Sequence, residues 1–535
     1  MRTPLEVLRG YAPHDYTLSG LLASRALVNG AKTLLVHAGG ETRYALFAAR
    51  VDAAARALAA RGVAHGDRVG AMATNGPDYV VLLFALARLG AILVPVNPEL
   101  GVQEAGYILQ HAGVRALATI PAALEVARAA SAPISPAPWL MLLEGEADGV
   151  PRFGALVDAA RAHALPSPPA PETTCLMLYT SGTTGFPKGV MHSQRNFVLA
   201  GEGFVARMWL QPEDRLMCIL PMFHINALFY SIAGTFAAGA SLVLVPKFSA
   251  STFWTTAAES GATQVNIIAA IGNILARRPR SEFDARHRLR VLYGAPITPD
   301  LEKTFREEFR VPVLIEGYGM TEIPGAANNP FDGERRPLSM GRPATHPDPQ
   351  VEYAALRVVD DAGRDAPDGT VGELWVKTPI LMQGYYKDPE QTAAALHDGW
   401  FATGDLVRRE ADGYYYFVAR KKDIIRRRGE NISGAEIDRV IGDHPAVVQC
   451  AALPVPSELG EDEILVAIIR KPDMDLSAQD IAEWCRARLA PIKVPRYVAF
   501  VDSLPQTATH RVAKFKLRGD KTLLERATDL ARQSR

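Results

Sequence analysis

The sequence predicts an α/β protein with a large N-terminal α/β domain and a small α+β C-terminal domain. Two observations predict this fold class. In the first half of the chain, helix-like and strand-like segments alternate, which is typical of parallel sheets covered by helices. After about residue 350 the chain changes to short strand-like segments separated by turns, and its last ~110 residues are a normal length for an independent domain.

The expected elements of the first half follow from composition and turn signals. The alanine-rich segment 49–61 predicts a helix that ends at Gly62. The longest apolar stretch, 79–96, carries Arg88 and Gly90, so it predicts a buried helix that runs into a strand rather than a membrane span. The alternating segments are residues 49–61, 68–73, 80–89, 91–96, 103–118, 253–260 and 265–269.

Turn residues mark the elements of the second half. The turns DDAG, PDG and ADG separate expected strands at 356–360, 372–377 and 414–419. The polar stretch 420–423 is the expected domain boundary, and the proline-rich run 165–172 is an expected linker. The last segment is expected to contain helices 435–441 and 478–489 and strands 447–453, 464–470 and 497–501.

Composition narrows the class of protein. The chain has 535 residues with 58 Lys+Arg against 58 Asp+Glu, so its zero net charge gives no electrostatic argument for a dedicated nucleic-acid binder. The four cysteines form no CxxC pair, which excludes a disulfide framework or a zinc ribbon and suits a reducing cytoplasm. The N-terminus lacks the apolar region of a secretory signal. We therefore expect a cytoplasmic enzyme with no membrane span and no nucleic-acid partner.

The most informative motif is LYTSGTTGFPKGV at residues 178–190. Within ten residues it contains four hydroxyl side chains, three glycines and Lys188. Backbone amides exposed by glycines, hydroxyl donors and an ammonium group are what a polyphosphate needs. It is not a Walker loop, because Phe-Pro separates Gly185 from the lysine. A solvated turn is the alternative interpretation, and this concentration of phosphate-binding groups favours the phosphate loop.

This loop resembles the signature of the adenylate-forming superfamily, which comprises acyl- and aryl-CoA synthetases, peptide-synthetase adenylation domains and luciferases. Four further motifs are similar to those of the family and follow in its order: YGMTE at 318–322, TGD at 403–405, RKKD at 420–423 and GENI at 429–432. The resemblance implies a multi-sheet AMP-binding and substrate domain, residues 1–420, and a mobile C-terminal domain, residues 421–535, with the hinge near Lys422.

The resemblance assigns the ATP phosphates to the loop and to the YGMTE motif. Lys188 and the loop would hold the β- and γ-phosphates, and Thr321 would contact the α-phosphate. Glu322 would hold Mg²⁺, a hard cation that usually takes one or two carboxylates beside phosphate oxygens. The loop residues expected to bind nucleotide are Thr180, Ser181, Gly182, Thr183, Thr184 and Gly185.

The adenosine contacts are implied in the same way. Tyr318 would stack on adenine, with a turn walling the other side of the base, and Asp405 would accept both ribose hydroxyls with the help of Arg420. Taken singly, each of these could equally be a core residue, a surface acid or a turn residue. The other nucleotide-binding residues expected are Gly294, Ala295 and Pro296 in the turn, and Gly317 and Gly319 beside the tyrosine.

Two further sets of residues are assigned by resemblance. His224 would line and gate an acyl pocket together with Asn226, and the remaining walls are expected around residues 266–273. A histidine inside an apolar run could also be an ordinary core residue. The residues expected to meet CoA are Gly429, Glu430, Lys493 and Arg496, and the arginines at 426–428 add positive charge near them.

The sequence departs from the family near its C-terminus. Where the family usually has a Gly-Lys pair whose lysine acts in adenylation, this chain has His510 and Arg511. Arginine keeps the charge but is not a neutral replacement. Lys514 is the other candidate for the adenylation cation, one turn onward if the stretch is helical. The endings KFKLR and GENIS look most like the carnitine/crotonobetaine-CoA ligase branch.

The function implied is an AMP-forming acyl-CoA synthetase that uses ATP, Mg²⁺ and coenzyme A. A small carboxylic acid would react with ATP to give acyl-AMP and pyrophosphate, and the CoA thiol would then give acyl-CoA and AMP. A stand-alone adenylation enzyme that loads a carrier protein, a luciferase-like oxygenase and a non-catalytic nucleotide-binding protein remain alternatives. The resemblance also allows a homodimer, and the sequence does not identify the acid.

Overall fold

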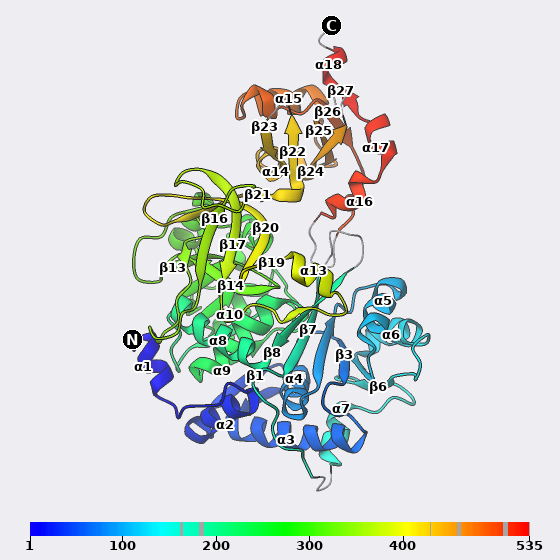
Figure 1. Cartoon of the computed structure of the whole chain (residues 1–535), viewed down its shortest axis with the longest axis vertical. Helices are drawn as coiled ribbons and strands as arrows, with labels where there is room; N and C mark the ends of the chain where they lie inside the picture. The colour runs from blue at the N-terminus through cyan, green and yellow to red at the C-terminus, as the bar shows by residue number, and fades with distance from the viewer. Residues whose placement is uncertain (161–163, 181–186, 428–429, 457–461, 507–511, 534–535) are drawn as a thin grey trace. The chain divides into compact units, whose positions relative to one another are not determined.

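The computed structural model describes residues 1–160, 164–180, 187–427, 430–456, 462–506 and 512–533. The chain divides into two compact units (Figure 1). The larger unit comprises the described residues within Met1–Thr180, Pro187–Leu356 and Val376–Phe401, and the smaller unit those within Arg357–Trp375 and Ala402–Arg535. The predicted domain boundary at residues 420–423 stays a prediction, because these units group residues by packing and not by movement.

A seven-stranded sheet in the larger unit has the order β18-β8-β7-β4-β3-β5-β6. The pairs β4–β7, β3–β4, β3–β5 and β5–β6 are parallel, which confirms the predicted α/β layers. Its strands are β3 (Arg68–Met72), β4 (Ile92–Val96), β5 (Ala116–Thr119), β6 (Trp139–Leu142), β7 (Thr174–Thr180), β8 (Lys188–Ser193) and β18 (Gly384–Tyr385). The helices between them are α3 (Tyr44–Ala60), α4 (Pro77–Leu89), α5 (Val102–Ala112), η1 (Pro121–Ala123), α6 (Leu124–Ser131) and α7 (Phe153–Asp158).

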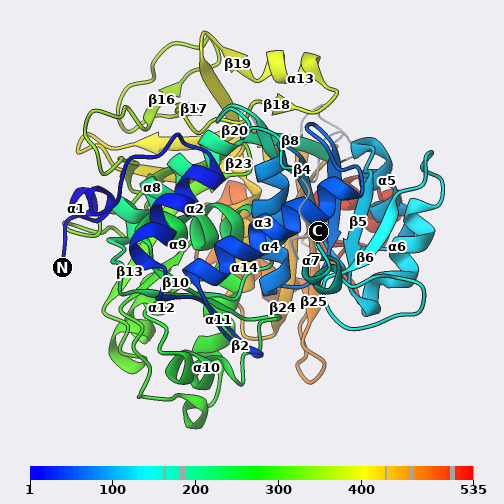
Figure 2. The same cartoon turned by 90° about the horizontal axis from the view of Figure 1, so that it is seen from below.

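The apolar stretch 79–96 forms a helix and a strand, as predicted. Helix α4 begins with Pro77, carries Asp78 in its first turn and Arg88 in its last, and ends where Gly90 takes the left-handed conformation at φ 69°. Proline at a helix start, matched end charges and a left-handed glycine are ordinary helix boundaries. Helices α5 and α6 lie side by side next to β5 and β6 (Figures 1 and 2).

A nine-stranded sheet completes the larger unit, in the order β15-β14-β13-β12-β11-β9-β10-β1-β2. Its strands are β1 (Thr33–His37), β2 (Gly40–Arg43), β9 (Arg215–Cys218), β10 (Ser241–Leu244), β11 (Gln264–Asn266), β12 (Val291–Gly294), β13 (Val313–Met320), β14 (Ile323–Asn328) and β15 (Arg342–Pro343). The α-helices around it are α1 (Pro4–Arg9), α2 (Leu18–Asn29), α8 (Gln194–Met208), α9 (Ala233–Ala238), α10 (Phe253–Ser260), α11 (Ala269–Arg277) and α12 (Pro299–Lys303). Two π-helices, η2 (Asn226–Ile232) and η4 (Thr304–Glu308), and the 3₁₀-helix η3 (Arg280–Glu282) accompany them.

One expected strand in this region is shorter than predicted. Strand β11 ends at Asn266, whereas the sequence predicted a strand over 265–269. The difference arises because Ile268 is already the N-cap of α11 and β11 pairs with its neighbours only through residues 264–266.

Aromatic side chains fill the core of the larger unit. Phe84 of α4, Phe47 of α3 and Phe236 of α9 contact one another. The Phe84 ring centroid lies 5.6 Å from that of Phe47 and 4.3 Å from that of Phe236. All three rings are buried, and such rings add packing energy beyond the area that they remove from water.

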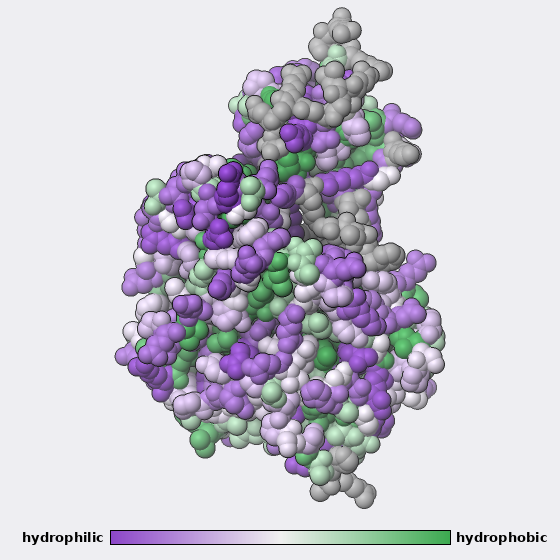
Figure 3. Space-filling view, in the orientation of Figure 1, coloured by the Kyte–Doolittle hydropathy of each residue, from purple (hydrophilic) through white to green (hydrophobic). Residues whose placement is uncertain are grey.

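Hydrophilic residues cover most of the visible face of this unit, where apolar residues form small separate groups (Figure 3).

The smaller unit begins with antiparallel strands that turn at DDAG, PDG and ADG, as predicted. Strand β20 (Trp400–Arg409) pairs with β21 (Tyr415–Arg420), and the sheet runs β16-β17-β20-β19. The other strands of this sheet are β16 (Ala355–Val359), β17 (Val371–Lys377) and the short β19 (Leu396–His397). Strand β19 and the helix before it, α13 (Pro389–Ala394), belong to the larger unit.

The rest of the smaller unit has α+β character. Strands β22 (Ile424–Arg427) and β23 (Glu430–Ser433) pair with each other, and a four-stranded sheet has the order β24-β25-β26-β27. Its strands are β24 (Val447–Pro456), β25 (Asp462–Arg470), β26 (Tyr497–Phe500) and β27 (Thr528–Asp529). The helices are η5 (Lys421–Asp423), α14 (Gly434–Gly442), α15 (Ala478–Arg486), η6 (Pro491–Lys493), α16 (Lys514–Arg518), α17 (Lys521–Glu525) and α18 (Leu530–Gln533).

One helix end in the C-terminal segment differs from the prediction, and the condition placed on Lys514 can be examined. Helix α15 ends at Arg486 rather than at residue 489, because residues 487–489 form a turn and Ala490, which precedes Pro491, is extended. Lys514 begins α16, but Val512 makes an isolated β-bridge with Gln506, so the described residues just before Lys514 are not helical. Across the described part of the chain, no helix is both long enough and apolar enough to cross a membrane.

Candidate active site

The predicted phosphate loop is carried by a β-hairpin. Strand β7 ends at Thr180 and β8 begins at Lys188, and these two residues face each other in the antiparallel register. The pairing continues through the next positions, Tyr179 with Gly189. The hairpin therefore holds both ends of the loop firmly, while Ser181, Gly182, Thr183, Thr184 and Gly185 lie outside the described residues.

Lys188 and Glu322 lie on either side of Tyr385. Strand β18 pairs with β8 so that Tyr385 faces Val190, which places its ring beside Lys188 on the same face of the sheet. The Lys188 Nζ atom lies 5.0 Å from the centre of that ring. The Tyr385 hydroxyl donates a hydrogen bond of 3.0 Å to Glu322 Oε1. The arrangement brings the Lys188 ammonium group and the buried Glu322 carboxylate to the same tyrosine.

Removing the Tyr385 hydroxyl tests this arrangement. The variant Tyr385→Phe loses a hydrogen bond to a carboxylate, a contact that contributes about 1.5–3 kcal/mol. We expect kcat/KM for Mg-ATP to fall about 10- to 100-fold with the fold intact, since the ring stays in place. Steady-state kinetics at varied Mg-ATP measure this. Tyr386→Phe is the matched control, and equal kinetics for the two variants would contradict the role of Tyr385.

Thr321 is held in place by a buried histidine. Thr321 and Glu322 form the two-residue turn between β13 and β14, where Met320 pairs with Ile323. His192 Nε2 lies 2.7 Å from the Thr321 carbonyl oxygen, so this nitrogen carries the proton and donates it. Asn196 Nδ2 lies 3.2 Å from the other ring nitrogen and donates to it. His192 is completely buried, and burial lowers its pKa to about 4.

The neutral state of His192 predicts a pH dependence of stability. Its folded-state pKa of about 4 lies below the ordinary value of 6.5, so its contribution is fully present above pH 6.5 and is lost as the pH falls toward 4. We expect the free energy of unfolding of His192→Phe to depend less steeply on pH in that window, by up to about 1.4 kcal/mol per pH unit. Urea unfolding at pH 4.5–7 measures it, and parallel curves for both proteins would contradict the assignment.

The predicted adenine wall is a turn at the end of β12. Gly294 ends β12, which is parallel to β13 and pairs with it so that Gly294 faces Glu316. The turn residues Ala295 and Pro296 are exposed, and Tyr318 on β13 is half-buried. Leu338 N donates to Glu316 Oε2 at 3.1 Å, and burial raises the pKa of this carboxyl to about 8. The tyrosine and the turn thus belong to adjacent parallel strands.

The two glycines beside Tyr318 allow close approach. A Cβ atom on Gly317 would lie 2.7 Å from the Tyr293 hydroxyl, and one on Gly319 would lie 2.6 Å from the Gly325 nitrogen. Both distances are shorter than real Cβ contacts, so any larger residue would have to displace strand β14 or a buried tyrosine. These glycines therefore serve packing around the tyrosine at least as much as contact with the nucleotide.

The predicted acyl-pocket residues lie at the start of π-helix η2. His224 is half-buried and its ring centroid lies 4.5 Å from that of Phe223. Asn226 Oδ1 accepts a hydrogen bond of 3.0 Å from Asn266 Nδ2, which also donates to Ser231 Oγ at 3.1 Å. The structure therefore places Asn226 next to the end of β11, the first of the expected wall residues 266–273.

Asp405 and Arg420 face each other within the smaller unit. They are register partners in β20 and β21, and Arg420 Nε lies 3.0 Å from Asp405 Oδ1. Asp405 is only 1% exposed. Thr403 Oγ1 accepts a hydrogen bond of 3.1 Å from the Asp405 amide and donates to the Leu374 carbonyl. A buried carboxylate next to an arginine suits the acceptance of two ribose hydroxyls.

The candidate CoA-binding cations are already paired. Lys493 Nζ lies 2.7 Å from Glu436, and Arg496 lies 3.1 Å from Asp529. Arg427 is buried and lies 2.8 Å from Glu463, so this member of the basic run has a structural role. Gly429 lies outside the described residues, and the structure describes only the backbone of Glu430 and Lys422, in β23 and η5.

Of the two candidate adenylation cations, the structure describes one. Lys514 Nζ lies 2.5 Å from Asp438 Oδ2, and both side chains are mostly buried. Burial raises the pKa of the Asp438 carboxyl, while Lys514 opposes that change. Lys514 is therefore engaged within the smaller unit. Arg511 lies outside the described residues.

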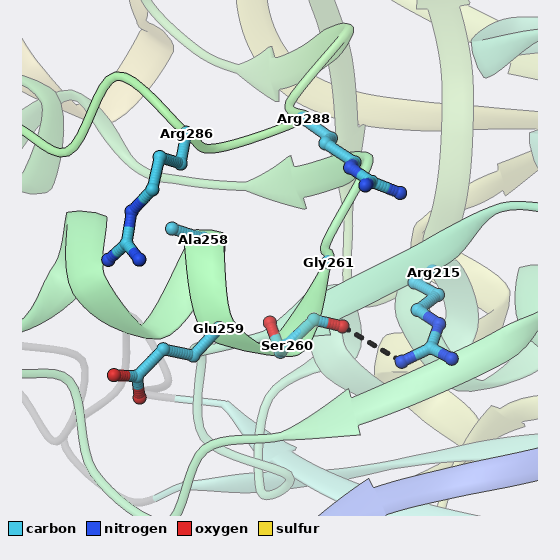
Figure 4. A pocket seen from close by; sticks show the side chains of 7 residues that line it. All are labelled: Arg215, Ala258, Glu259, Ser260, Gly261, Arg286 and Arg288. Carbon is cyan, nitrogen blue, oxygen red and sulfur yellow. Dashed lines mark hydrogen bonds between the residues drawn. The ribbon is translucent and has the colours of Figure 1, made fainter.

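A cavity elsewhere in the larger unit contains none of these residues. The cavity has a volume of about 390 Å³. At its edge Arg215 donates a hydrogen bond of 2.9 Å to the Ser260 carbonyl (Figure 4). Arg286, which also lines it, is paired with Asp284. The lining residues are Arg215, Ala258, Glu259, Ser260, Gly261, Arg286 and Arg288. This cavity is separate from the candidate site.

Three side chains of the site could not be found from the sequence. Tyr385 lies 63 residues after its partner Glu322, and His192 follows the loop motif without any spacing rule that links it to Thr321. Arg207 on α8 is a further buried residue close to the YGMTE strand. In the sequence it reads as an ordinary helix arginine, so only three-dimensional packing reveals it.

Comparisons with known proteins identify the family of the chain. The AMP-binding enzyme family model matches residues 22–386, and the model of the AMP-binding enzyme C-terminal domain matches residues 436–511. A sulfoacetate–CoA ligase from Cupriavidus necator is 34% identical over 94% of this chain and 97% of its own length. A crotonobetaine/carnitine–CoA ligase from Salmonella choleraesuis is 31% identical over 92% of this chain and 96% of its own.

A solved structure shows the same architecture. The anthranilate CoA ligase AuaEII in complex with anthranoyl-AMP superposes with a TM-score of 0.84 at 26% identity, covering 95% of this chain and 97% of that one. The resemblance read from the motifs at 178–432 is thus confirmed over both the larger and the C-terminal parts. The chain belongs to the AMP-binding enzyme family.

Proposed function

We propose that this chain is an AMP-forming acid–CoA ligase that joins a carboxylic acid to coenzyme A through an acyl-adenylate. The observation that carries the proposal is the placement of Lys188 and Glu322 around Tyr385 at the base of the phosphate-loop hairpin. The relatives reported above are named as CoA ligases, which supports CoA as the acceptor over a carrier protein or oxygen. Their acids differ, so they leave the acid of this chain open.

In the first half-reaction the acid attacks ATP. A lone pair on a carboxylate oxygen forms a bond to the α-phosphorus, and the bond to the bridging oxygen breaks with its electrons leaving on pyrophosphate. Lys188 and the loop residues are proposed to hold the β- and γ-phosphates, and Thr321 the α-phosphate. Asp405 and Arg420 are proposed to bind the ribose and Tyr318 the adenine. Catalysis here is positioning and charge stabilisation.

The carboxylate of Glu322 fits a magnesium ion. Glu322 is buried, and its oxygen is oriented by the Tyr385 hydroxyl. Within the described ranges no three His, Cys, Asp or Glu residues cluster as metal ligands, and Mg²⁺ bound with phosphates needs only one or two carboxylates. We propose that Glu322 holds Mg²⁺, which when bound neutralises phosphate charge.

In the second half-reaction the CoA thiol attacks the acyl carbon and AMP leaves. We propose that the C-terminal domain, residues 421–535, reorients near Lys422 between the two steps. Gly429, Glu430, Lys493 and Arg496 remain the proposed CoA contacts. For Lys493 and Arg496 this requires that they bind CoA while keeping or exchanging their ion pairs with Glu436 and Asp529.

Product analysis tests the proposal. The protein is incubated with Mg-ATP, CoA and a panel of short-chain, medium-chain, aromatic, betaine-type and dicarboxylic acids. AMP is then separated from ADP, and the CoA products are identified by mass spectrometry. We expect AMP, pyrophosphate and one new acyl-CoA mass in equal amounts. Formation of AMP without a thioester would indicate an acceptor other than CoA. Formation of ADP would contradict the adenylate route.

A further inference from the structure

Arg207 is a buried cation without a counter-ion. It lies near the end of α8 and is 3% exposed. Among the residues that the structure describes, its Nε and Nη1 atoms have no hydrogen-bond partner, and no carboxylate forms an ion pair with it. A buried charge of this kind is costly unless an anion completes its surroundings.

Aromatic rings surround the guanidinium. Its central carbon lies 5.0 Å from the ring centre of Tyr230, 5.4 Å from that of Tyr293 and 5.7 Å from that of Phe204. Ring faces attract a cation but do not supply the oxygen acceptors that a guanidinium fork matches. We call Arg207, Tyr230 and Tyr293 the arginine–tyrosine cluster.

The nearby carboxyl of Glu316 does not supply the missing charge. Glu316 lies on β13 next to the end of β12, the strand that carries Tyr293. Burial raises the pKa of Glu316 to about 8, so the group is mostly neutral at pH 7. Its oxygen is occupied by the Leu338 amide. The cluster therefore keeps a net positive charge.

The cluster packs against the strands that carry the reactive motif. A Cβ atom on Gly325 would lie 1.9 Å from Arg207 Nη2, so the guanidinium touches the backbone of β14. A Cβ atom on Gly319 would lie 2.7 Å from the Tyr230 hydroxyl. Glycines 319 and 325 stand on either side of the Thr321–Glu322 turn. The cluster therefore packs against the β13–β14 hairpin, whose turn carries Thr321 and Glu322.

The cluster also joins the proposed acyl pocket. Tyr230 belongs to η2, the same π-helix that begins with Asn226. Residues four positions apart on a helix lie on one face. Two tyrosine hydroxyls and a guanidinium thus fill the space beside the glycine backbones, where an apolar acyl chain would need small or apolar side chains. The Tyr230 hydroxyl lies beside Gly319, two residues from Thr321, so an acid that reaches from that turn to the cluster is short, and the positive charge of the cluster suits an anionic end.

We propose that Arg207 determines specificity by binding a second anionic group, carboxylate or sulfonate, at the far end of a short acid substrate. The tyrosine hydroxyls donate to the same group, and the anion completes the coordination of the Arg207 Nε and Nη1 atoms. This inference rests on the proposed function, since it names the substrate class of that same site.

The test compares charged acids with neutral acids of similar length. Malonate, succinate and 3-sulfopropanoate are assayed against butanoate and pentanoate by AMP formation with Mg-ATP and CoA. The wild-type enzyme is expected to prefer one of the charged acids by at least 10-fold in kcat/KM. In Arg207→Met, kcat/KM for that acid is expected to fall about 10- to 100-fold, mainly through a higher KM, while kcat/KM for the neutral acids stays unchanged. Arg207→Lys is expected to recover part of the loss.

Controls separate specificity from folding and from failure of the proposed function. Arg195→Met, which removes an arginine from the start of the same helix, is expected to leave the preference unchanged. The inference would be overturned if Arg207→Met lowered kcat/KM equally for all acids, or if the wild-type enzyme preferred neutral acids. Arg207 would then be a structural residue. If no acid at all gives AMP with the wild-type protein while ATP binds, the proposed function fails instead.

Discussion

Replacing Asp405 by alanine is expected to lower kcat/KM for acyl-adenylate formation by about 10²- to 10⁴-fold. Asp405 is 1% exposed and is proposed to accept two ribose hydroxyls. Each hydrogen bond to a charged group contributes about 1.5–3 kcal/mol, so losing two gives that range. The substitution also leaves Arg420 without the carboxylate that lies 3.0 Å from it, so the arginine is no longer held beside the ribose.

Pyrophosphate exchange with ATP measures this effect without the second half-reaction. Asp405→Asn keeps an acceptor oxygen and the residue's volume, and is expected to lose less than the alanine variant. Asp368→Ala is the matched control. It also removes a carboxylate that is paired with an arginine of β20, because Asp368 Oδ1 lies 2.5 Å from Arg409 Nε. Exchange within twofold of the wild type for folded Asp405→Ala would refute the assigned role.

Replacing Arg511 by alanine is expected to stop adenylation while sparing thioester formation. By the motif resemblance Arg511 is proposed to take the place of the family's adenylation lysine, and a fixed cation at the reacting carboxylate and α-phosphate contributes about 10²- to 10³-fold to the rate. Lys514, the other candidate, has its Nζ 2.5 Å from Asp438 Oδ2, so it is already committed to a contact within the smaller unit.

Lys514→Met is therefore expected to act on stability. Removing the partner of the mostly buried Asp438 leaves a charge unpaired and lowers the free energy of unfolding by about 1–3 kcal/mol, with adenylation kept within a few-fold. The two variants are compared by pyrophosphate exchange, by thioester formation from supplied acyl-AMP, and by urea unfolding. Loss of exchange in folded Lys514→Met, with Arg511→Ala active, would reverse the assignment.

Local signals predicted the elements of this chain well. The apolar stretch 79–96 becomes α4 and β4 because Pro77 and Gly90 mark its helix ends within a few residues of sequence. The same holds for the DDAG and ADG turns of the smaller unit. The end of α15 was missed, because the apolar pattern continues to Leu489 whereas residues 487–489 already form a turn.

The candidate site was predictable where a motif is continuous and not where it is assembled by packing. The loop at 178–190 and the YGMTE motif carry their chemistry in adjacent residues. Tyr385 reaches Glu322 only because β18 pairs with β8, and no local pattern specifies which distant strands pair. Arg207 joins α8 to η2, β12 and β14 in the same non-local way.

The acyl-adenylate is the central claim, and isotope transfer tests it most directly. An acid that the enzyme activates is labelled with ¹⁸O in its carboxylate and converted in the presence of Mg-ATP and CoA. The attacking carboxylate oxygen stays on phosphorus when the thiol displaces AMP, so the AMP formed is expected to carry one ¹⁸O atom. Unlabelled AMP, with the label in pyrophosphate or retained in full by the acyl group, would contradict an acyl-adenylate intermediate.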